Sequence, residues 1–172
     1  MGASDCRSTG HARKAPYFML ALALIGIADA YYDSYMIYAG QPLWCPPPID
    51  GCNIVAGSPY ARIVDVPLGY FGVVYYVYMF GLAALLAFDP FSRGLRLGVL
   101  LLAATGVAFS IYFMYIQFTF IHAFCIYCLI SAVLTLLLLI AAIWHFRATR
   151  TDPTTAAEIK ALNVRQSLTV GA

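Results

Sequence analysis

Hydrophobic residues form four long runs along the chain, and short polar segments separate these runs. The runs cover residues 16–38, 67–88, 95–118 and 124–146. Because about 20 helical residues are needed to cross the hydrocarbon core of a bilayer, each run is long enough to span a membrane. The first run is also too long for the apolar region of a cleaved signal peptide. The pattern therefore predicts an all-α fold, an integral membrane four-helix bundle.

The polar segments predict how the rest of the chain is arranged around this bundle. One transmembrane domain over residues 16–146 is expected between two tails, at 1–15 and 147–172. The longest connection inside the domain is the loop over residues 39–66. The other connections are short, so consecutive helices are expected to be antiparallel neighbours.

A short helix is expected inside the long loop. Ser58 is a residue type that often precedes a helix, and Pro59 suits the first helical position. Pro67 disfavours helix at the residue before it, so the segment has to end near Val66. We therefore expect a half-helix over residues 59–65 that covers the mouth of the bundle.

Composition and charge placement agree with a membrane protein and give it an orientation. Hydrophobic residues make up 62% of the chain and charged residues 10%, whereas soluble domains average about 45–50% apolar residues. Lys and Arg near helix ends stay on the cytoplasmic side, and nine of the ten basic residues lie in the tails or near the 89–94 turn. Both termini are therefore expected in the cytoplasm, with the chain in a cell inner membrane or plasma membrane. The basic residues form no stripe, so no nucleic-acid partner is expected.

This orientation sorts the five cysteines into two groups. Cys6 lies in the N-terminal tail and is expected to be an unpaired bystander. Cys45 and Cys52 lie in the outer loop, and Cys125 and Cys128 open the fourth run after a short outer turn. Four cysteines thus share the non-cytoplasmic side, where disulfides form and persist.

Cys125 and Cys128 have the spacing of a redox motif. Residues three apart on a helix face the same side, with about 5–6 Å between Cβ atoms. The first turn of a helix also favours a thiolate, because its free N–H groups carry the positive end of the dipole. The thiolate is the species that exchanges disulfides. At about 1.5 Å per residue, Cys128 lies about 4.5 Å further along the helix than Cys125 and is better placed for a lipid-soluble substrate.

The loop pair, Cys45 and Cys52, is separated by six residues, among them three prolines and Gly51. The prolines stiffen the arm and Gly51 permits a turn, which suits a dithiol on a semi-rigid arm. Two structural disulfides in a non-enzymatic membrane protein and a four-thiolate zinc site are alternatives. Zinc sites usually draw on two closely spaced cysteine pairs, and no metal is expected here. A redox relay explains the two pairs on one face better.

The order of these motifs resembles the vitamin K epoxide reductase family, in its short bacterial form, over residues 16–146. The matching features are the loop cysteine pair, Ser58-Pro-Tyr60, Pro67-Leu-Gly-Tyr-Phe-Gly72 at the start of the second run, and Cys125-x-Tyr-Cys128 at the start of the last run. Another bacterial family of quinone-linked thiol oxidases also has four spans and four outer cysteines. Its CxxC motif opens the second helix, so the order here favours the vitamin K epoxide reductase family.

The resemblance implies a membrane enzyme that carries electrons from protein dithiols to a quinone of the menaquinone, ubiquinone or vitamin K type. It implies that Cys128 reacts with the quinone and that Cys125 exchanges with Cys52. Cys45 is then the residue that exchanges with a thioredoxin-like partner. Family members carry a Ser or Thr near the bound quinone, and Ser58 occupies that position.

Two departures from the family pattern refine this expectation. Many bacterial relatives carry a fused thioredoxin-like domain after the last span, and this chain does not, so a separate partner protein on the outer face is expected. Animal members have a tyrosine four residues after the CxxC motif, where this chain has Ala132. That difference weakens the alternative activity, reduction of vitamin K quinone or epoxide. The expected function is therefore reoxidation of the partner in support of disulfide-bond formation.

Tyrosines near the outer end are candidates for the quinone site. Most of them fit an ordinary aromatic belt at the membrane interface. Tyr112 and Tyr115 are the two that we expect to donate hydrogen bonds to a quinone carbonyl.

Three ionisable residues near the cysteines have two interpretations each. Ionisable groups inside a membrane cost about 2.5–3.5 kcal/mol at mid-helix. Asp29 is therefore expected to be paired within the bundle or, as the second interpretation, to serve a proton path, while Asp33 is expected to be solvated near the outer surface or paired with Arg62. His122 either stabilises the thiolate of Cys125 or caps the turn before it.

Overall fold

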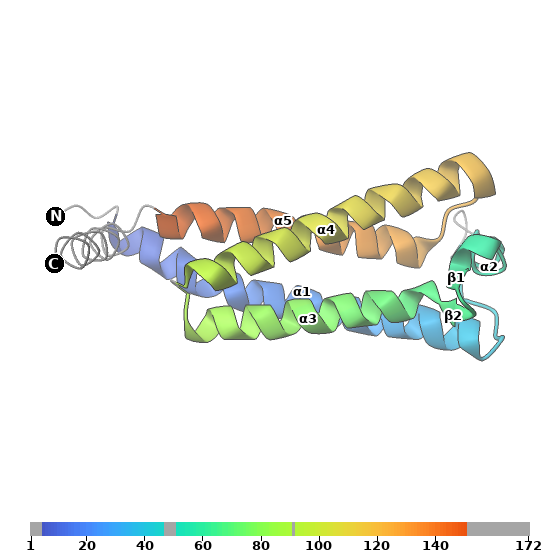
Figure 1. Cartoon of the computed structure of the whole chain (residues 1–172), viewed down its shortest axis with the longest axis horizontal. Coiled ribbons are helices and arrows are strands. Elements are labelled where there is room, and N and C mark those ends of the chain that lie inside the picture. Colours follow the sequence, from blue (N-terminus) through green and yellow to red (C-terminus); the bar gives the residue numbers. More distant parts are fainter. Residues whose placement is uncertain (1–4, 47–50, 91, 151–172) are drawn as a thin grey trace, which may run out of the picture.

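The fold is a bundle of four long helices, and the computed structural model describes it over residues 5–46, 51–90 and 92–150, with side chains from 14 to 149. Figure 1 shows the helices lying along the long axis of the molecule. They are α1 (Asp5–Tyr38), α3 (Leu68–Phe88), α4 (Arg93–Ile116) and α5 (Ile126–Arg150). At its far end α4 continues into a short π-helical turn, η2 (Gln117–Ile121).

All four helices are suited to a membrane. The stretches long and apolar enough to cross it are Lys14–Tyr38, Leu68–Phe88, Arg93–Ile121 and Ile126–Thr149. Large apolar side chains such as those of Leu101 and Val133 are more than half exposed on the outside of the bundle, which is the surface that lipid covers. The predicted all-α membrane bundle is confirmed.

The first helix starts earlier than the apolar run. It begins at Asp5, so Pro16 lies inside it and not at its start. A helix can extend beyond the N-terminal end of an apolar run, because Ala, Lys and Arg are good helix formers in water. The residues before Pro16, Arg13-Lys14-Ala15, are of this kind.

Close helix contacts build the core. Gly26 of α1 lies against the ring of Tyr76 in α3, since a Cβ at position 26 would be 2.5 Å from Tyr76 Cδ1. The Tyr76 hydroxyl reaches α5, where it shares a hydrogen bond of 2.8 Å with Ser131 Oγ. Buried apolar side chains fill the rest of the space and include Met19, Ala23, Met79, Ala103 and Leu138.

The loop between α1 and α3 folds over one end of the bundle. It contains α2 (Cys52–Ala56), the 3₁₀ turn η1 (Pro59–Ala61), and two short strands, β1 (Arg62–Ile63) and β2 (Val66–Pro67). The strands pair antiparallel, with Ile63 opposite Val66. We call this end of the bundle the cysteine end.

The expected half-helix over residues 59–65 is wrong beyond Ala61. Val64 and Asp65 adopt positive φ values of 49° and 62°, and they form the turn between the two strands. β-branched residues on either side of the turn favour extended backbone. The regular helix of the loop lies earlier, at Cys52–Ala56.

Candidate active site at the cysteine end

The four cysteines expected to act together lie together. Cys52 and Cys125 are 0% and 2% exposed and belong to one buried cluster, against which Cys45 and Cys128 pack. Cys45 and Cys52 form a disulfide with 6.2 Å between their Cα atoms, whereas Cys125 and Cys128 are free thiols. The site therefore holds one disulfide and one dithiol in contact.

Gly51 brings the loop against the turn that precedes the dithiol. A Cβ at this position would lie 2.6 Å from the carbonyl oxygen of Phe124 and 2.8 Å from its nitrogen. The φ of Gly51 is −74°, which any residue adopts, so the turn that we expected does not require glycine. Glycine is required here for lack of space, because the neighbouring atoms belong to the backbone and cannot move aside as a flexible side chain could. The contact sets Cys52 beside Cys125.

We expect Gly51→Ala to slow disulfide exchange between the loop pair and the dithiol by roughly 10- to 100-fold, the scale on which small misplacements of reacting groups act. The reason is that the added methyl group pushes Cys52 away from Cys125. The measurement is the rate at which reduced loop cysteines reduce an oxidised Cys125–Cys128 pair in rapid-quench trapping. Gly81→Ala is the matched control, because an added Cβ there meets nothing within 4 Å. Equal rates for both variants would contradict this role for the contact.

Two hydrogen-bonded side chains fix the arm that carries Cys45. Asn53 pairs with the backbone of Leu43 through both ends of its amide, at 2.8 and 3.1 Å. The Tyr127 hydroxyl donates to the carbonyl oxygen of Trp44 at 2.8 Å. Since Tyr127 lies between the two thiols of the CxxC motif, the Cys45 arm is tied directly to that motif.

The dithiol lies at the start of α5, as the spacing predicts. Cys125 is the residue before the helix, and its carbonyl accepts a hydrogen bond from the Leu129 N–H at 3.1 Å. The Cys128 thiol hydrogen-bonds to the Cys125 sulfur, and this lowers the pKa of Cys125 against the opposing effect of burial. Cys125 is thus favoured as the thiolate, the form that exchanges disulfides and is the better leaving group.

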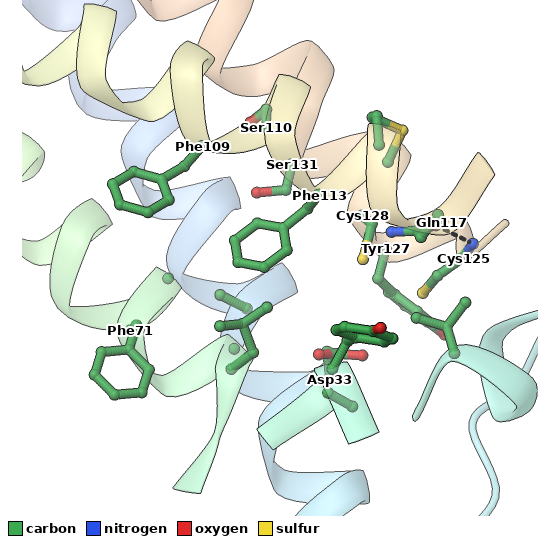
Figure 2. A pocket seen from close by; sticks show the side chains of 18 of the residues that line it. Asp33, Phe71, Phe109, Ser110, Phe113, Gln117, Cys125, Tyr127, Cys128 and Ser131 are labelled. Carbon is green, nitrogen blue, oxygen red and sulfur yellow. Dashed lines mark hydrogen bonds between the residues drawn. The ribbon is translucent and has the colours of Figure 1, made fainter. Parts of the chain in front are cut away.

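Gln117 is a site residue that the sequence reasoning missed. Its side chain is 3% exposed, and its Oε1 accepts a hydrogen bond from the Cys125 N–H at 3.0 Å (Figure 2). His122, which we considered for a role beside Cys125, is exposed and turns the chain with φ of 54°. The signal that could have found Gln117 is a lone amide in an apolar run, eight residues before the first thiol.

An apolar cavity of about 480 Å³ adjoins the thiols, and Cys52, Cys125 and Cys128 are part of its wall. Figure 2 shows the two thiols of α5 on one side of it and the rings of Phe71 and Phe109 on the other. Pockets for small organic ligands have volumes of about 300–1,000 Å³ and mostly apolar walls. The cavity therefore suits a flat apolar molecule in reach of the dithiol.

The candidate quinone residues are placed differently from one another. Ser58 lines the cavity, and its hydroxyl donates to the Val55 carbonyl at 2.7 Å. Tyr112 and Tyr115 do not line it: they are 56% and 58% exposed, on the outer face of α4. These two tyrosines therefore lie outside this cavity, because the face of α4 that points inward carries other residues, including Phe109 and Phe113.

Both acidic residues of α1 reach the cavity wall. Asp29 and Asp33 lie one turn apart in α1, and both are part of this wall. Arg62, the partner suggested for Asp33, donates from Nη2 to the carbonyl oxygen of Ile37 at 3.2 Å. Within the ranges described, no three side chains of His, Cys, Asp or Glu are grouped so that they could hold a metal ion.

A disulfide and a dithiol packed in one cluster at the end of a membrane bundle are typical of one class of protein, the membrane oxidoreductases. The comparison with family models gives the particular family. The model described as the vitamin K epoxide reductase family matches residues 17–143, which is most of the chain, and the chain belongs to this family. The resemblance seen in the motifs is thereby confirmed. A search of curated proteins found no match.

Proposed function

We propose that the protein is a quinone-dependent thiol–disulfide oxidoreductase that reoxidises a separate thioredoxin-like protein and so supports disulfide-bond formation. One observation carries the proposal. Cys52 of the disulfide and Cys125 of the dithiol are buried in one cluster, and Cys128 lines an apolar cavity. Such an arrangement joins a thiol relay to a site for a lipid-soluble acceptor.

The first half of the cycle takes electrons from the partner. A thiolate of the reduced partner attacks Cys45 and opens the Cys45–Cys52 disulfide, and the partner leaves in its own disulfide form. Cys45 is the accessible end, because it is partly exposed beside Trp44, which is 70% exposed, while Cys52 is fully buried. Two electrons now reside on the loop dithiol.

Internal exchange then moves these electrons to α5. The Cys52 thiolate attacks Cys125 in an oxidised Cys125–Cys128 pair, and Cys45 resolves the mixed disulfide by attacking Cys52. The loop disulfide re-forms and the dithiol of α5 is left reduced. The lowered pKa of Cys125 makes it a good leaving group in this step.

The second half of the cycle reduces the quinone. The Cys128 thiolate adds to a quinone bound in the cavity, and Cys125 then attacks the Cys128 sulfur, so that a disulfide forms and hydroquinone leaves. Two thiols lose two electrons and two protons, and the quinone gains them. A menaquinone, ubiquinone or vitamin K type fits this chemistry, and Ser58 is proposed as part of the binding site.

The positions of the basic residues support one orientation in the membrane. Because Lys and Arg near helix ends stay in the cytoplasm, we place both termini there and the cysteine end on the outer face, where the partner would be found. A membrane-impermeant maleimide applied to intact cells after mild reduction should label Cys45. Labelling of Cys45 only after the cells are opened would show that the orientation is the opposite one.

The experiment that tests the function uses the full chain purified in detergent. It is mixed with a reduced thioredoxin-like protein and either a menaquinone or a ubiquinone analogue, and the loss of quinone absorbance is followed together with partner thiols. We expect one quinone to be reduced for each dithiol oxidised. No quinone-coupled oxidation with either acceptor would refute the proposed function and favour cysteines that only stabilise the fold.

A further inference from the structure

The Gln117 side chain is a buried amide at the junction of the dithiol and the cavity. It projects from η2, where a single π-helical turn ends the α4 rod. Only 3% of the residue is exposed, and it forms part of the cavity wall. A primary amide carries one acceptor and two N–H donors, and burying it is favourable only when these groups find partners.

The hydrogen bond to Cys125 fixes which way the amide faces. The Cys125 N–H is a donor, so the amide atom 3.0 Å from it has to be the oxygen. The NH₂ group is then directed to the opposite side. There it lies beside the Cys128 sulfur, and Figure 2 shows the nitrogen end of Gln117 on the side of Cys128.

We propose that Gln117 is a catalytic residue whose NH₂ group donates a hydrogen bond to the quinone oxygen that becomes negatively charged when Cys128 attacks. This inference rests on the proposed function and names a group that acts in its quinone step. The donor is in place before the reaction, because the Cys125 backbone holds the other end of the same amide. Preorganised donors of this kind stabilise a developing oxyanion without reorganisation.

The step balances in electrons and protons. The Cys128 thiolate forms an S–C bond to the quinone ring, and the π electrons move onto a carbonyl oxygen, where Gln117 donates. The Cys125 thiolate next attacks the Cys128 sulfur, and the S–C bond breaks with its electron pair entering the ring. The two protons released by the thiols convert the product to hydroquinone.

The main test is Gln117→Met, which keeps the approximate size of the side chain and removes the donor and the acceptor. Single-turnover reduction of menadione by the pre-reduced protein should fall by about 10²- to 10³-fold, as for other oxyanion donors. Alkylation of Cys128 by iodoacetamide develops no oxyanion on a carbonyl of the reagent, so it should change by less than about threefold when both rates are compared on the high-pH plateau of thiol ionisation. This comparison separates donation to the quinone from a general effect on the thiols.

A second variant, Gln117→Glu, keeps an acceptor for the Cys125 N–H. The introduced carboxylic acid can donate when protonated and cannot when ionised, so menadione reduction should fall as the pH rises through the pKa of this new carboxyl group. In the wild type the rate should rise with pH to a plateau. If Gln117→Glu is as slow as Gln117→Met at every pH, including pH values at which the new carboxyl group is protonated, donation by the side chain at position 117 is contradicted.

Tyr115→Phe is the matched control, because it removes one polar group two residues away on the exposed face of α4. It should reduce menadione at the wild-type rate. Near-normal menadione reduction by Gln117→Met would overturn the inference while leaving the proposed function intact, as would an equal loss in alkylation. A wild-type protein that does not reduce menadione or the other quinones would overturn both.

Discussion

Cys128→Ala is expected to abolish quinone reduction, with a fall on the order of 10³-fold or more, as when other covalent enzymes lose their nucleophile. Of the two thiols at the start of α5, Cys128 is the one that lies further into the helix, and it lines the cavity. Cys125 is 2% exposed and sits at the loop side of the same turn. The measurement is quinone absorbance in a single turnover with pre-reduced protein.

The same variant should also trap the relay at a defined point. Without Cys128, the Cys125 thiolate can still attack Cys52 of the loop disulfide, and the released Cys45 thiol is the group that can reverse this step. When iodoacetamide blocks that thiol, a disulfide between Cys52 and Cys125 should accumulate and be identified by mass spectrometry of peptides. A trapped bond between Cys45 and Cys125 would show that the order of the relay is wrong. Cys6→Ala, at the predicted bystander, should behave as the wild type.

Cys45→Ala is expected to lose turnover with a thioredoxin-like partner by at least about 10²-fold and to keep turnover with a small dithiol such as dithiothreitol. The partner needs an accessible sulfur, and Cys52 is fully buried, so the loop offers it only Cys45. A small dithiol can reduce the Cys125–Cys128 pair without the loop. The measurement is quinone reduction with each donor under the same conditions.

Comparing the two electron donors, the thioredoxin-like protein and the small dithiol, separates the roles of Cys45 and Cys128. Cys128→Ala should fail with both of them, whereas Cys45→Ala should fail only with the protein. If the two variants behave alike, the loop and the helix pair do not act in sequence. Trp44→Ala is a useful companion, because it changes the exposed surface beside Cys45 and leaves both sulfurs present.

The helices and the gathering of the cysteines could be predicted because each rests on a strong sequence signal. A bilayer requires an apolar run of fixed length, and the positions of Lys14 and Arg93 beside such runs set the alternation of the helices. Once the helices alternate, a pair in the long loop and a pair at the start of the last helix have to meet at one end. Which of the two pairs forms the disulfide is not set by the spacing, and the structure alone shows it to be Cys45–Cys52.

The residues that face the cavity could not be predicted in the same way. A helix in lipid is apolar on every side, so hydrophobic periodicity does not tell its inner face from its outer face. Tyr112 and Tyr115 were chosen for their chemistry alone, and they lie on the outer face of α4, away from the cavity. Gln117 lies in the π-helical turn η2 with its side chain against the Cys125 N–H, and this turn has no clear signature in the sequence.

The paired hydrogen bonds between Asn53 and Leu43 have a consequence for the moment when the loop disulfide is open. They join nearly the same two segments as the Cys45–Cys52 bond, two residues before the first sulfur and one after the second. Opening the covalent link would otherwise release a loop whose closure has to be regained at an entropic cost. With these two hydrogen bonds in place, the reduced loop is expected to keep the sulfurs of Cys45 and Cys52 close to each other. The disulfide can then re-form without a new loop closure.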